Sequence, residues 1–201
     1  MRRMGLKKIM ILEDEVIVAT DLSELLTNAG YELTFAHSYE KALSIAVEFQ
    51  PHLILCDIDL GTSKNGVDFS KELTKLFPSV EIIYVTAFSS PEAVDAASET
   101  SPLNYIVKPW NEKQMLTTVA IAFNYISNKQ QQSDLLSLLS LSEYRVLELI
   151  ARQQSSKEIA TLLNIAEKTV RNHRYNIIKK LSLPNDNNSL LKWALLNFKT
   201  F

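Results

Sequence analysis

The first 128 residues of this chain alternate between short apolar runs and segments in which apolar residues recur at helical spacing. This regular alternation favours a parallel β-sheet with helices on both faces, because parallel strands need a crossover between them. The second apolar run alternates apolar with polar residues and is therefore predicted to be an edge strand. The apolar runs lie near residues 7–12, 31–36, 52–56, 80–85 and 103–107.

Polar side chains follow four of these runs directly. Glu13 and Asp14 follow the first run, Asp57 the third, Thr86 the fourth and Lys108 the fifth. Ligands collect at the carboxyl ends of parallel strands, so we expect these side chains to converge. Each one alone has an ordinary explanation, such as an acid at a helix start or a surface lysine. Together they suit a divalent metal and a phosphoryl group, with one carboxylate as the acceptor.

The order, spacing and strand context of these residues resemble the receiver domain of two-component response regulators. The resemblance covers residues 5–128. The steps from Asp14 to Asp57, Thr86 and Lys108 are 43, 29 and 22 positions, as in the family. The resemblance implies a doubly wound α/β domain with a five-stranded parallel sheet. The matching residues are Glu13-Asp14, Asp57, Thr86-Ala87 and Tyr105-Ile106-Val107-Lys108-Pro109.

The resemblance also implies roles for these residues. Asp57 is expected to accept a phosphoryl group from a phosphohistidine on a sensor histidine kinase. Asp14, Asp57 and the backbone carbonyl of Asp59, with Glu13 through water, are expected to hold Mg²⁺, a hard ion that prefers oxygen ligands. The metal and Lys108 would offset the charge that opposes attack on an anionic donor. The peptide bond from Lys108 to the next residue, a proline, is expected to be cis.

Thr86 and Tyr105 are the switch residues that the resemblance implies. A phosphoryl oxygen offers Thr86 a charge-assisted hydrogen bond, and Tyr105 would fill the space that Thr86 leaves. Phosphorylation would then shift an existing two-state equilibrium. The loop Asp57–Gly66 departs from the family, because it lacks a proline and places Gly66 one residue late. This departure leaves the geometry of the loop and the lifetime of the phosphorylated state open.

The balance of charge changes after this region. Residues 1–129 carry 11 Lys and Arg against 17 Asp and Glu, a formal charge of −6, whereas residues 130–201 carry 10 against 6, a charge of +4. An acidic part joined to a basic part suggests two tasks, the second involving nucleic acid. We interpret the polar stretch 129–138 as a linker. A helical conformation is equally compatible there, because Gln and Lys form helices well.

Four short helical patterns follow, near residues 140–152, 155–163, 167–181 and 188–198. Ser140 and Ser155 each precede a Glu by three positions, the spacing of a capping box. Residues Leu139–Leu183 resemble the LuxR-type helix-turn-helix domain of the NarL/FixJ class, so we expect residues 139–201 to form a small all-α four-helix domain. The resemblance is carried by Ser155-Ser156-Lys157-Glu158-Ile159-Ala160 and by Glu167-Lys168-Thr169-Val170-Arg171-Asn172-His173.

The third of these helices has the composition of a recognition helix, with an apolar side and a basic, amide-bearing side that can enter a major groove. An ordinary solvated face has the same pattern, and the family resemblance decides between the two. By analogy, three residues are expected at base edges: Arg171, Asn172 and Tyr175. Four others are expected at phosphates or the sugar backbone: Lys168, Thr169, His173 and Lys179.

Three positions depart from the LuxR-type pattern: Gln153 replaces a usual glycine, Leu141 a frequent proline and Arg145 a usual acid. Gln153 is expected to strain the turn after the first helix or to lengthen that helix. The last helix is richer in apolar residues than one core requires. The family uses this helix for dimerisation, which predicts a homodimer, favoured by phosphorylation, on an inverted DNA repeat. Complete packing inside the domain is the alternative.

These features together predict a transcription regulator whose DNA binding is controlled by phosphorylation, and not an enzyme. Two other functions remain open: a phosphorelay or adaptor protein whose C-terminal domain binds a protein, and a constitutive DNA-binding protein. The single Cys56 cannot form an internal disulfide, and no apolar stretch has the length of a membrane span, so a cytoplasmic location without membrane contact is expected. The sequence does not reveal the stimulus, the kinase or the target genes.

Overall fold

The structure is a computed structural model that describes residues 7–87, 91–186 and 188–198. The chain divides into two compact units, with the boundary between Ile126 and Ser127. Each unit has its own apolar core, and each is described separately below.

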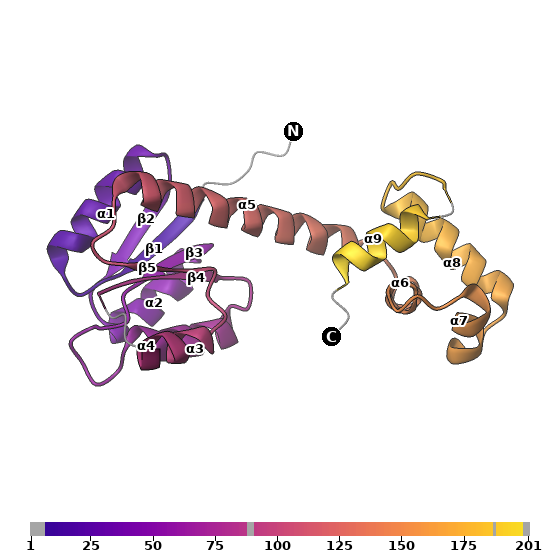
Figure 1. The fold of residues 1–201 in the computed structure, drawn as a ribbon, viewed down its shortest axis with the longest axis horizontal. Coiled ribbons are helices and arrows are strands. Elements are labelled where there is room, and N and C mark those ends of the chain that lie inside the picture. Colours follow the sequence, from indigo (N-terminus) through magenta and orange to yellow (C-terminus); the bar gives the residue numbers. More distant parts are fainter. Residues whose placement is uncertain (1–6, 88–90, 187, 199–201) are drawn as a thin grey trace. The chain divides into compact units, whose positions relative to one another are not determined.

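The N-terminal unit contains a five-stranded parallel sheet with the strand order β2-β1-β3-β4-β5 (Figure 1). This order confirms the predicted parallel sheet and places the second strand at an edge, as its alternating sequence indicated. All five strands lie within two residues of the predicted runs. They are β1 (Lys8–Leu12), β2 (Glu32–Ala36), β3 (Leu53–Cys56), β4 (Glu81–Thr86) and β5 (Asn104–Val107).

Helices cover both faces of this sheet, which confirms the doubly wound arrangement. Strand residues alternate between the faces: Met10 and Leu12 pack in one core, and Ile9 and Ile11 in the other. One core is shared with α1 (Val16–Asn28) and the first part of α5 (Glu112–Ser137). The other core is shared with α2 (Tyr39–Phe49), α3 (Gly66–Leu76) and α4 (Pro91–Ser98).

The register of the strands brings their carboxyl ends level. Leu12 pairs with Cys56, Cys56 pairs with Tyr84, and Thr86 pairs with Val107. The residues that follow β1, β3 and β5 therefore leave the sheet at the same edge. This is the geometric reason that residues far apart in sequence can form one site.

The C-terminal unit consists of four short helices, as predicted, and the end of α5 packs against its core. Both predicted capping boxes are present, one between Ser140 and Glu143 and one between Ser155 and Glu158. In each box the serine side chain accepts a hydrogen bond from the glutamate N–H, and the glutamate side chain accepts one from the serine N–H. The helices are α6 (Leu141–Ala151), α7 (Ser156–Leu163), α8 (Glu167–Lys180) and α9 (Ser189–Asn197).

The segment 129–138 is helical up to Ser137, because α5 continues through it. Leu135 and Leu136 pack against the C-terminal core, and the side-chain amide of Gln132 donates a hydrogen bond to the Asn197 carbonyl at 2.6 Å. Of the two conformations that the sequence left open for this segment, the structure has the helix. The sequence left both conformations open because the segment is mostly polar, and Leu135 and Leu136 near its end are the residues of the segment that pack against the core.

Candidate phosphorylation site and nucleic-acid interface

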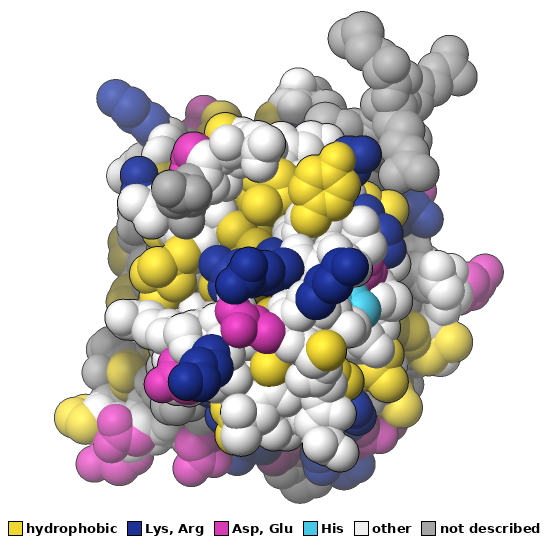
Figure 2. Space-filling model, turned by 90° about the vertical axis from the view of Figure 1, so that its right-hand side faces the viewer, with side chains coloured by type: hydrophobic (Ala, Val, Ile, Leu, Met, Phe, Trp, Pro, Cys, Tyr) yellow, Lys and Arg dark blue, Asp and Glu magenta, His cyan; other side chains and the backbone are white. Residues whose placement is uncertain are grey.

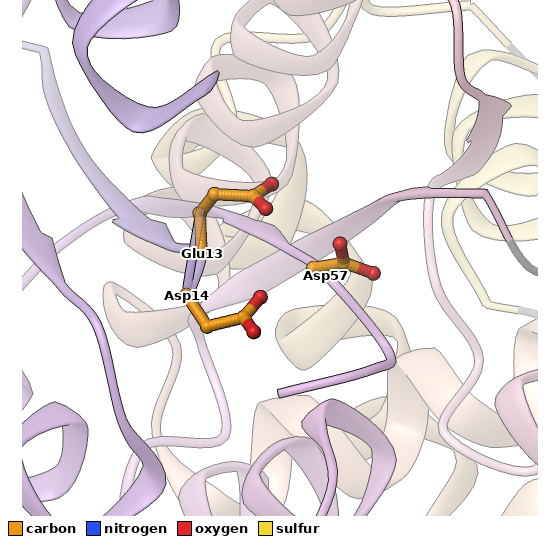
Figure 3. Close-up of side chains that lie close together, drawn as sticks. All are labelled: Glu13, Asp14 and Asp57. Carbon is orange, nitrogen blue, oxygen red and sulfur yellow. The ribbon is translucent and has the colours of Figure 1, made fainter. Parts of the chain in front are cut away.

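Three carboxylates meet at the carboxyl edge of the sheet. One oxygen from each of Glu13, Asp14 and Asp57 lies within 4.8 Å of the others. Figure 3 shows the three side chains close together with their carboxylates projecting to the same side, two from the end of β1 and one from the end of β3. Glu13 and Asp57 are 1% and 6% exposed, whereas Asp14 reaches solvent. The predicted acidic cluster is therefore assembled, with an open side at Asp14.

Lys108 enters the cluster from the end of β5. Its Nζ lies 2.5 Å from Asp57 Oδ2 and 2.9 Å from Glu13 Oε1. The Lys108 N–H donates to the Thr86 carbonyl at 2.9 Å, so the lysine backbone is anchored to β4. The peptide bond between Lys108 and Pro109 is cis, as expected. One ammonium thus contacts two carboxylates that would otherwise repel each other at close range.

The charges in this cluster shift the affinity of its groups for protons. Burial raises the pKa of Glu13 to about 7, although the hydrogen bond from Lys108 acts in the opposite direction. Burial opposes the charged form of Lys108, but its hydrogen bonds to Asp57 and Glu13 outweigh burial and raise its pKa. The ionised form of Glu13 therefore carries a free-energy cost in the protein without a bound cation. A bound cation would relieve that cost.

The donor set fits Mg²⁺. A small polar hollow of about 130 Å³ lies beside the carboxylates, and its lining includes Asp14, Asp57 and Asp59. Glu13 Oε2 is buried and has no hydrogen bond of acceptable geometry, although it lies 2.8 Å from Lys108 Nζ. Such an oxygen can accept a hydrogen bond from a metal-bound water. Hard carboxylate oxygens around a partly open hollow are the ligands that Mg²⁺ takes together with phosphoryl groups.

The structure also places the two expected switch residues. Thr86 is fully buried and lines the hollow that Asp57 lines. Tyr105 is half-buried, and its ring centroid lies 6.2 Å from that of Tyr84. Gly61 also lines the hollow, and Glu15 Oε1 lies 4.0 Å from Lys108 Nζ. The sequence analysis assigned no role to these last two residues, because nothing in their local pattern distinguishes them from ordinary loop residues.

The conformation of the loop after Asp57 explains why a glycine is needed at position 66, one residue later than in the family. Gly66 N–H donates to the Ile58 carbonyl at 2.8 Å, which closes the loop. A Cβ atom at Gly66 would lie 1.9 Å from the Asp57 carbonyl oxygen, a distance that no side chain tolerates. The first residue of α3 must therefore be glycine at this position of the chain.

Helix α8 presents the predicted DNA-contacting side chains to solvent. Val170 and Ile177 are buried in the C-terminal core, which leaves the opposite side of the helix exposed. Figure 2 looks at the side of the molecule on which α7 and α8 lie, and Lys and Arg side chains gather near the middle of that view. His173 is half-buried, whereas the other six predicted contact residues are exposed: Lys168, Thr169, Arg171, Asn172, Tyr175 and Lys179.

Contacts within α8 engage two of these side chains. Arg171 Nη2 lies 2.7 Å from Glu167 Oε1, one helical turn earlier. Lys179 Nζ lies 4.8 Å from the Tyr175 ring centroid. Arg174 is a basic residue of this helix that the sequence analysis did not select. It is half-buried near the core side, and burial lowers its pKa. Its helical position beside Val170 gave no sign of a surface role.

Two family matches agree with this geometry. Residues 9–120 match the family described as the response regulator receiver domain, and residues 137–191 match the family described as bacterial regulatory proteins of the luxR family. The first match alone covers more than half of the chain. The chain belongs to the response regulator family. The luxR-family match identifies it as a response regulator with a helix-turn-helix output domain.

Curated relatives and solved structures support the same assignment for this response regulator. The oxygen regulatory protein NreC of Staphylococcus aureus strain MRSA252 is 27% identical over 198 residues, which cover 88% of this chain and 91% of NreC. A CheY-like receiver domain from Methanospirillum hungatei JF-1 is 25% identical, with a TM-score of 0.60, and covers 62% of this chain and 99% of that one. The response regulator StyR, at 24% identity and a TM-score of 0.52, shares the fold over 95% of this chain and 98% of its own.

The family assignment decides the general function. This response regulator is a transcription regulator of a two-component system, since response regulators with a luxR-type helix-turn-helix output domain are transcription factors and not enzymes. Its receiver and helix-turn-helix domains imply a kinase partner and DNA binding. Among the residues that the structure describes, no helix is both long and apolar enough to cross a membrane.

Proposed function

We propose that Mg²⁺-dependent phosphorylation of Asp57 by a sensor histidine kinase controls DNA binding through α8. The observation that carries this proposal is the contact of Lys108 with Asp57 inside a cluster of three carboxylates at one edge of the sheet. A structural cluster of buried carboxylates would also need an ammonium partner, but it would not need an adjoining hollow. A phosphoryl-transfer site needs both, because positive charge must offset the charge of the donor.

The chemistry assigned to Asp57 is nucleophilic. Its carboxylate oxygen forms the new bond to phosphorus while the phosphorus–nitrogen bond of the kinase phosphohistidine breaks. The Asp59 N–H donates to Asp57 Oδ1 at 3.2 Å, and Lys108 holds Oδ2, so both oxygens are oriented. Bound Mg²⁺ would neutralise phosphoryl charge. Asp14, Asp57 and the backbone carbonyl of Asp59, with Glu13 through water, are the proposed ligands.

Thr86 and Tyr105 are the proposed switch. Thr86 lines the same hollow as Asp57, so this residue borders the region that a phosphoryl group on Asp57 would occupy. A charge-assisted hydrogen bond would hold Thr86 toward the phosphoryl group. Tyr105 pairs with Tyr84 in the register of β4 and β5, two positions before the partner of Thr86, and its ring packs against Tyr84. Inward movement of Thr86 would leave room for Tyr105.

We assign Arg171, Asn172 and Tyr175 to base edges in the major groove. Lys168, Thr169, His173 and Lys179 are assigned to the DNA backbone. Six of these seven side chains are exposed on one helix, which supports the assignment together with the luxR-family match. Because we propose that the protein acts on DNA, we also propose a cytoplasmic location.

Helix α9 is the proposed dimer contact. Leu190 and Ala194 are buried in the C-terminal core, whereas Leu195 and Leu196 are 44% and 84% exposed. The exposed pair is apolar surface that the core does not use, and burial between two copies would remove it from water. A two-fold dimer would present two α8 helices to an inverted repeat. The proposed domains are 5–128 for the receiver and 139–201 for the DNA-binding fold, with 129–138 as the connection.

The test measures phosphorylation and DNA binding in the full chain. Acetyl phosphate with Mg²⁺ should label the wild type, and Asp57→Asn should abolish the labelling. Asp59→Asn is the matched control and should retain it, because the proposed ligand from Asp59 is its backbone carbonyl. Beryllofluoride should raise DNA affinity at fixed salt concentration in the wild type but not in Asp57→Asn. Labelling that persists in Asp57→Asn would refute the site.

The two other functions are separated by the same assays. An adaptor protein would keep its regulatory effect when Arg171→Ala and Asn172→Ala are combined. The proposed regulator would lose DNA binding with intact phosphorylation. A constitutive DNA-binding protein would have the same DNA affinity with and without beryllofluoride. The match to the luxR family of bacterial regulatory proteins favours the regulator over the adaptor.

A further inference from the structure

The unusual loop between β3 and α3 is closed at its base by a backbone hydrogen bond. Gly66 N–H donates to the Ile58 carbonyl at 2.8 Å, so residues 59–65 project from this bond. Ile58 and Leu60 are buried in the core beneath the loop, which fixes its first part. Asn65 caps α3 in a capping box with Asp68, which fixes its end. Residues 61–64, between these anchors, are exposed.

Lys64 connects this exposed part to another element. Its Nζ lies 4.2 Å from the centroid of the Tyr39 ring on α2, close enough for a cation–π interaction. Thr62 Oγ1 donates to the Lys64 carbonyl at 2.7 Å, so the turn moves together with the lysine. Tyr39 is only 4% exposed, and its hydroxyl donates to Glu72 on α3. Burial and the hydrogen bond to Glu72 therefore hold the Tyr39 ring in place beneath the Lys64 ammonium.

The same loop forms one wall of the hollow beside Asp57. Asp59 and Gly61 line that hollow, and Gly61 N–H donates to Asp59 Oδ1 at 3.0 Å. A Cβ atom at Gly61 would lie 3.4 Å from Asp14 Oδ2, so the loop backbone runs close to the carboxylates. Movement of residues 61–64 would open this wall to water.

We propose that Lys64 and Tyr39 are positioning residues that hold the loop over the hollow and so lengthen the lifetime of phosphorylated Asp57. The inference rests on the proposed function of Asp57. In the decay reaction a water oxygen forms a bond to phosphorus, the phosphorus–oxygen bond to Asp57 breaks, and both water protons stay with the phosphate product, which leaves dihydrogen phosphate and the free carboxylate. Lys64 touches none of these atoms. It acts through the position of residues 59–61, which limits the access of water.

The experiment measures the first-order decay of phosphorylated full-length protein in Mg²⁺ buffer after acetyl phosphate is removed. Lys64→Gln removes the cation, and we expect decay at least threefold faster than in the wild type. Lys64→Arg keeps a cation that stacks on an aromatic ring, and should decay within 1.5-fold of the wild type.

Lys71→Gln is the matched control. Lys71 is a partly exposed lysine that pairs with Glu99 at 2.6 Å and lines no part of the hollow, so its loss should leave the decay rate unchanged. Thermal unfolding of each variant separates a change in the loop from a general loss of stability. Unchanged or slower decay in Lys64→Gln, or equally fast decay in Lys64→Arg, would overturn the inference. Absence of labelling in the wild type would instead overturn the proposed function.

Discussion

Gln153 adopts a backbone conformation that side chains with a Cβ atom disfavour. Its φ is 60°, in the left-handed region, at the end of α6. The Gln153 N–H donates to the Ile150 carbonyl at 2.8 Å and the Gln154 N–H to the Leu149 carbonyl at 3.1 Å, so the turn closes the helix as a glycine would close it. The sequence analysis expected strain here from the missing glycine, and the positive φ is the form that this strain takes.

Gln153→Gly should stabilise the C-terminal unit, because glycine adopts the left-handed region without the cost of a Cβ atom. We expect a gain of about 0.5–1 kcal/mol, less than the full penalty because glycine also loses more entropy on folding. Urea unfolding followed by Trp193 fluorescence in a Trp110→Phe background measures it. Gln154→Gly, where φ is not positive, is the control and should not stabilise. A loss of stability in Gln153→Gly would contradict this account.

Glu143 is a buried acid that the sequence analysis identified only as a capping residue. Its Oε2 accepts hydrogen bonds from Lys180 Nζ at 2.6 Å and from the Ser140 N–H at 2.7 Å. Burial alone would raise the pKa of Glu143, but these hydrogen bonds outweigh burial and hold the pKa below its usual value. The ionised form is therefore favoured by folding.

This shift predicts how the stability of the C-terminal unit depends on pH. Glu143 has a lower pKa folded than unfolded, so its contribution is present above the unfolded value of about 4.5 and is lost as pH falls through the folded pKa. Glu143→Gln should cost about 1–2 kcal/mol at pH 7 and should flatten the stability profile below pH 5. Urea unfolding from pH 7 to pH 3 tests this. Glu148→Gln is the control, at a partly exposed acid of the same helix, and an equal effect there would disprove the assignment to Glu143.

Helix α5 shows where element bounds depend on tertiary contacts. The apolar stripe from Met115 to Ile126 predicts a helix, and the polar residues after it gave no reason to continue or to stop. The structure continues the helix to Ser137, and Leu135 and Leu136 join the C-terminal core. The last part of α5 therefore belongs to the packing of the DNA-binding unit, and a cut at residue 139 would remove it.

Leu136→Ala should lower the stability of the C-terminal unit by about 1–2 kcal/mol. This loss is smaller than the loss expected for a fully buried leucine, because Leu136 is only half-buried. Leu138→Ala is the matched control, since Leu138 is 53% exposed and does not belong to the core cluster. Its effect should be within about 0.5 kcal/mol. Urea unfolding with the same Trp193 probe compares the two. Equal effects would show that the end of α5 does not support the unit.

For the whole molecule, the division of charge between the two units bears on DNA affinity. The formal charge of the chain is −2, yet the region from residue 130 onward carries +4. DNA affinity should therefore depend on local contacts of α8 with phosphates and not on the overall charge. Each phosphate contact releases counterions and contributes about −0.9 to the slope of log affinity against log salt concentration.

Lys168→Ala should weaken binding to all DNA sequences similarly and should reduce the magnitude of the salt slope by about 1. Arg171→Ala should instead reduce the preference for the specific site, because bidentate base contacts carry sequence discrimination. Lys192→Ala, on α9, is the control for charge alone and should leave the salt slope unchanged. Titrations at several salt concentrations with specific and unrelated DNA measure both effects. A salt slope unchanged in Lys168→Ala would remove the phosphate assignment.

The sequence by itself determined the parallel sheet, its edge strand, the four C-terminal helices and the set of strand-end residues, because hydrophobic periodicity and capping spacings are local properties. It could not determine distances across the sheet. Only the tertiary structure decided that Lys108 contacts both Asp57 and Glu13, and that Lys64 reaches the Tyr39 ring. It likewise decided where α5 ends. The reason is physical: these features depend on strand register and side-chain packing between segments far apart in the chain, and local sequence encodes neither.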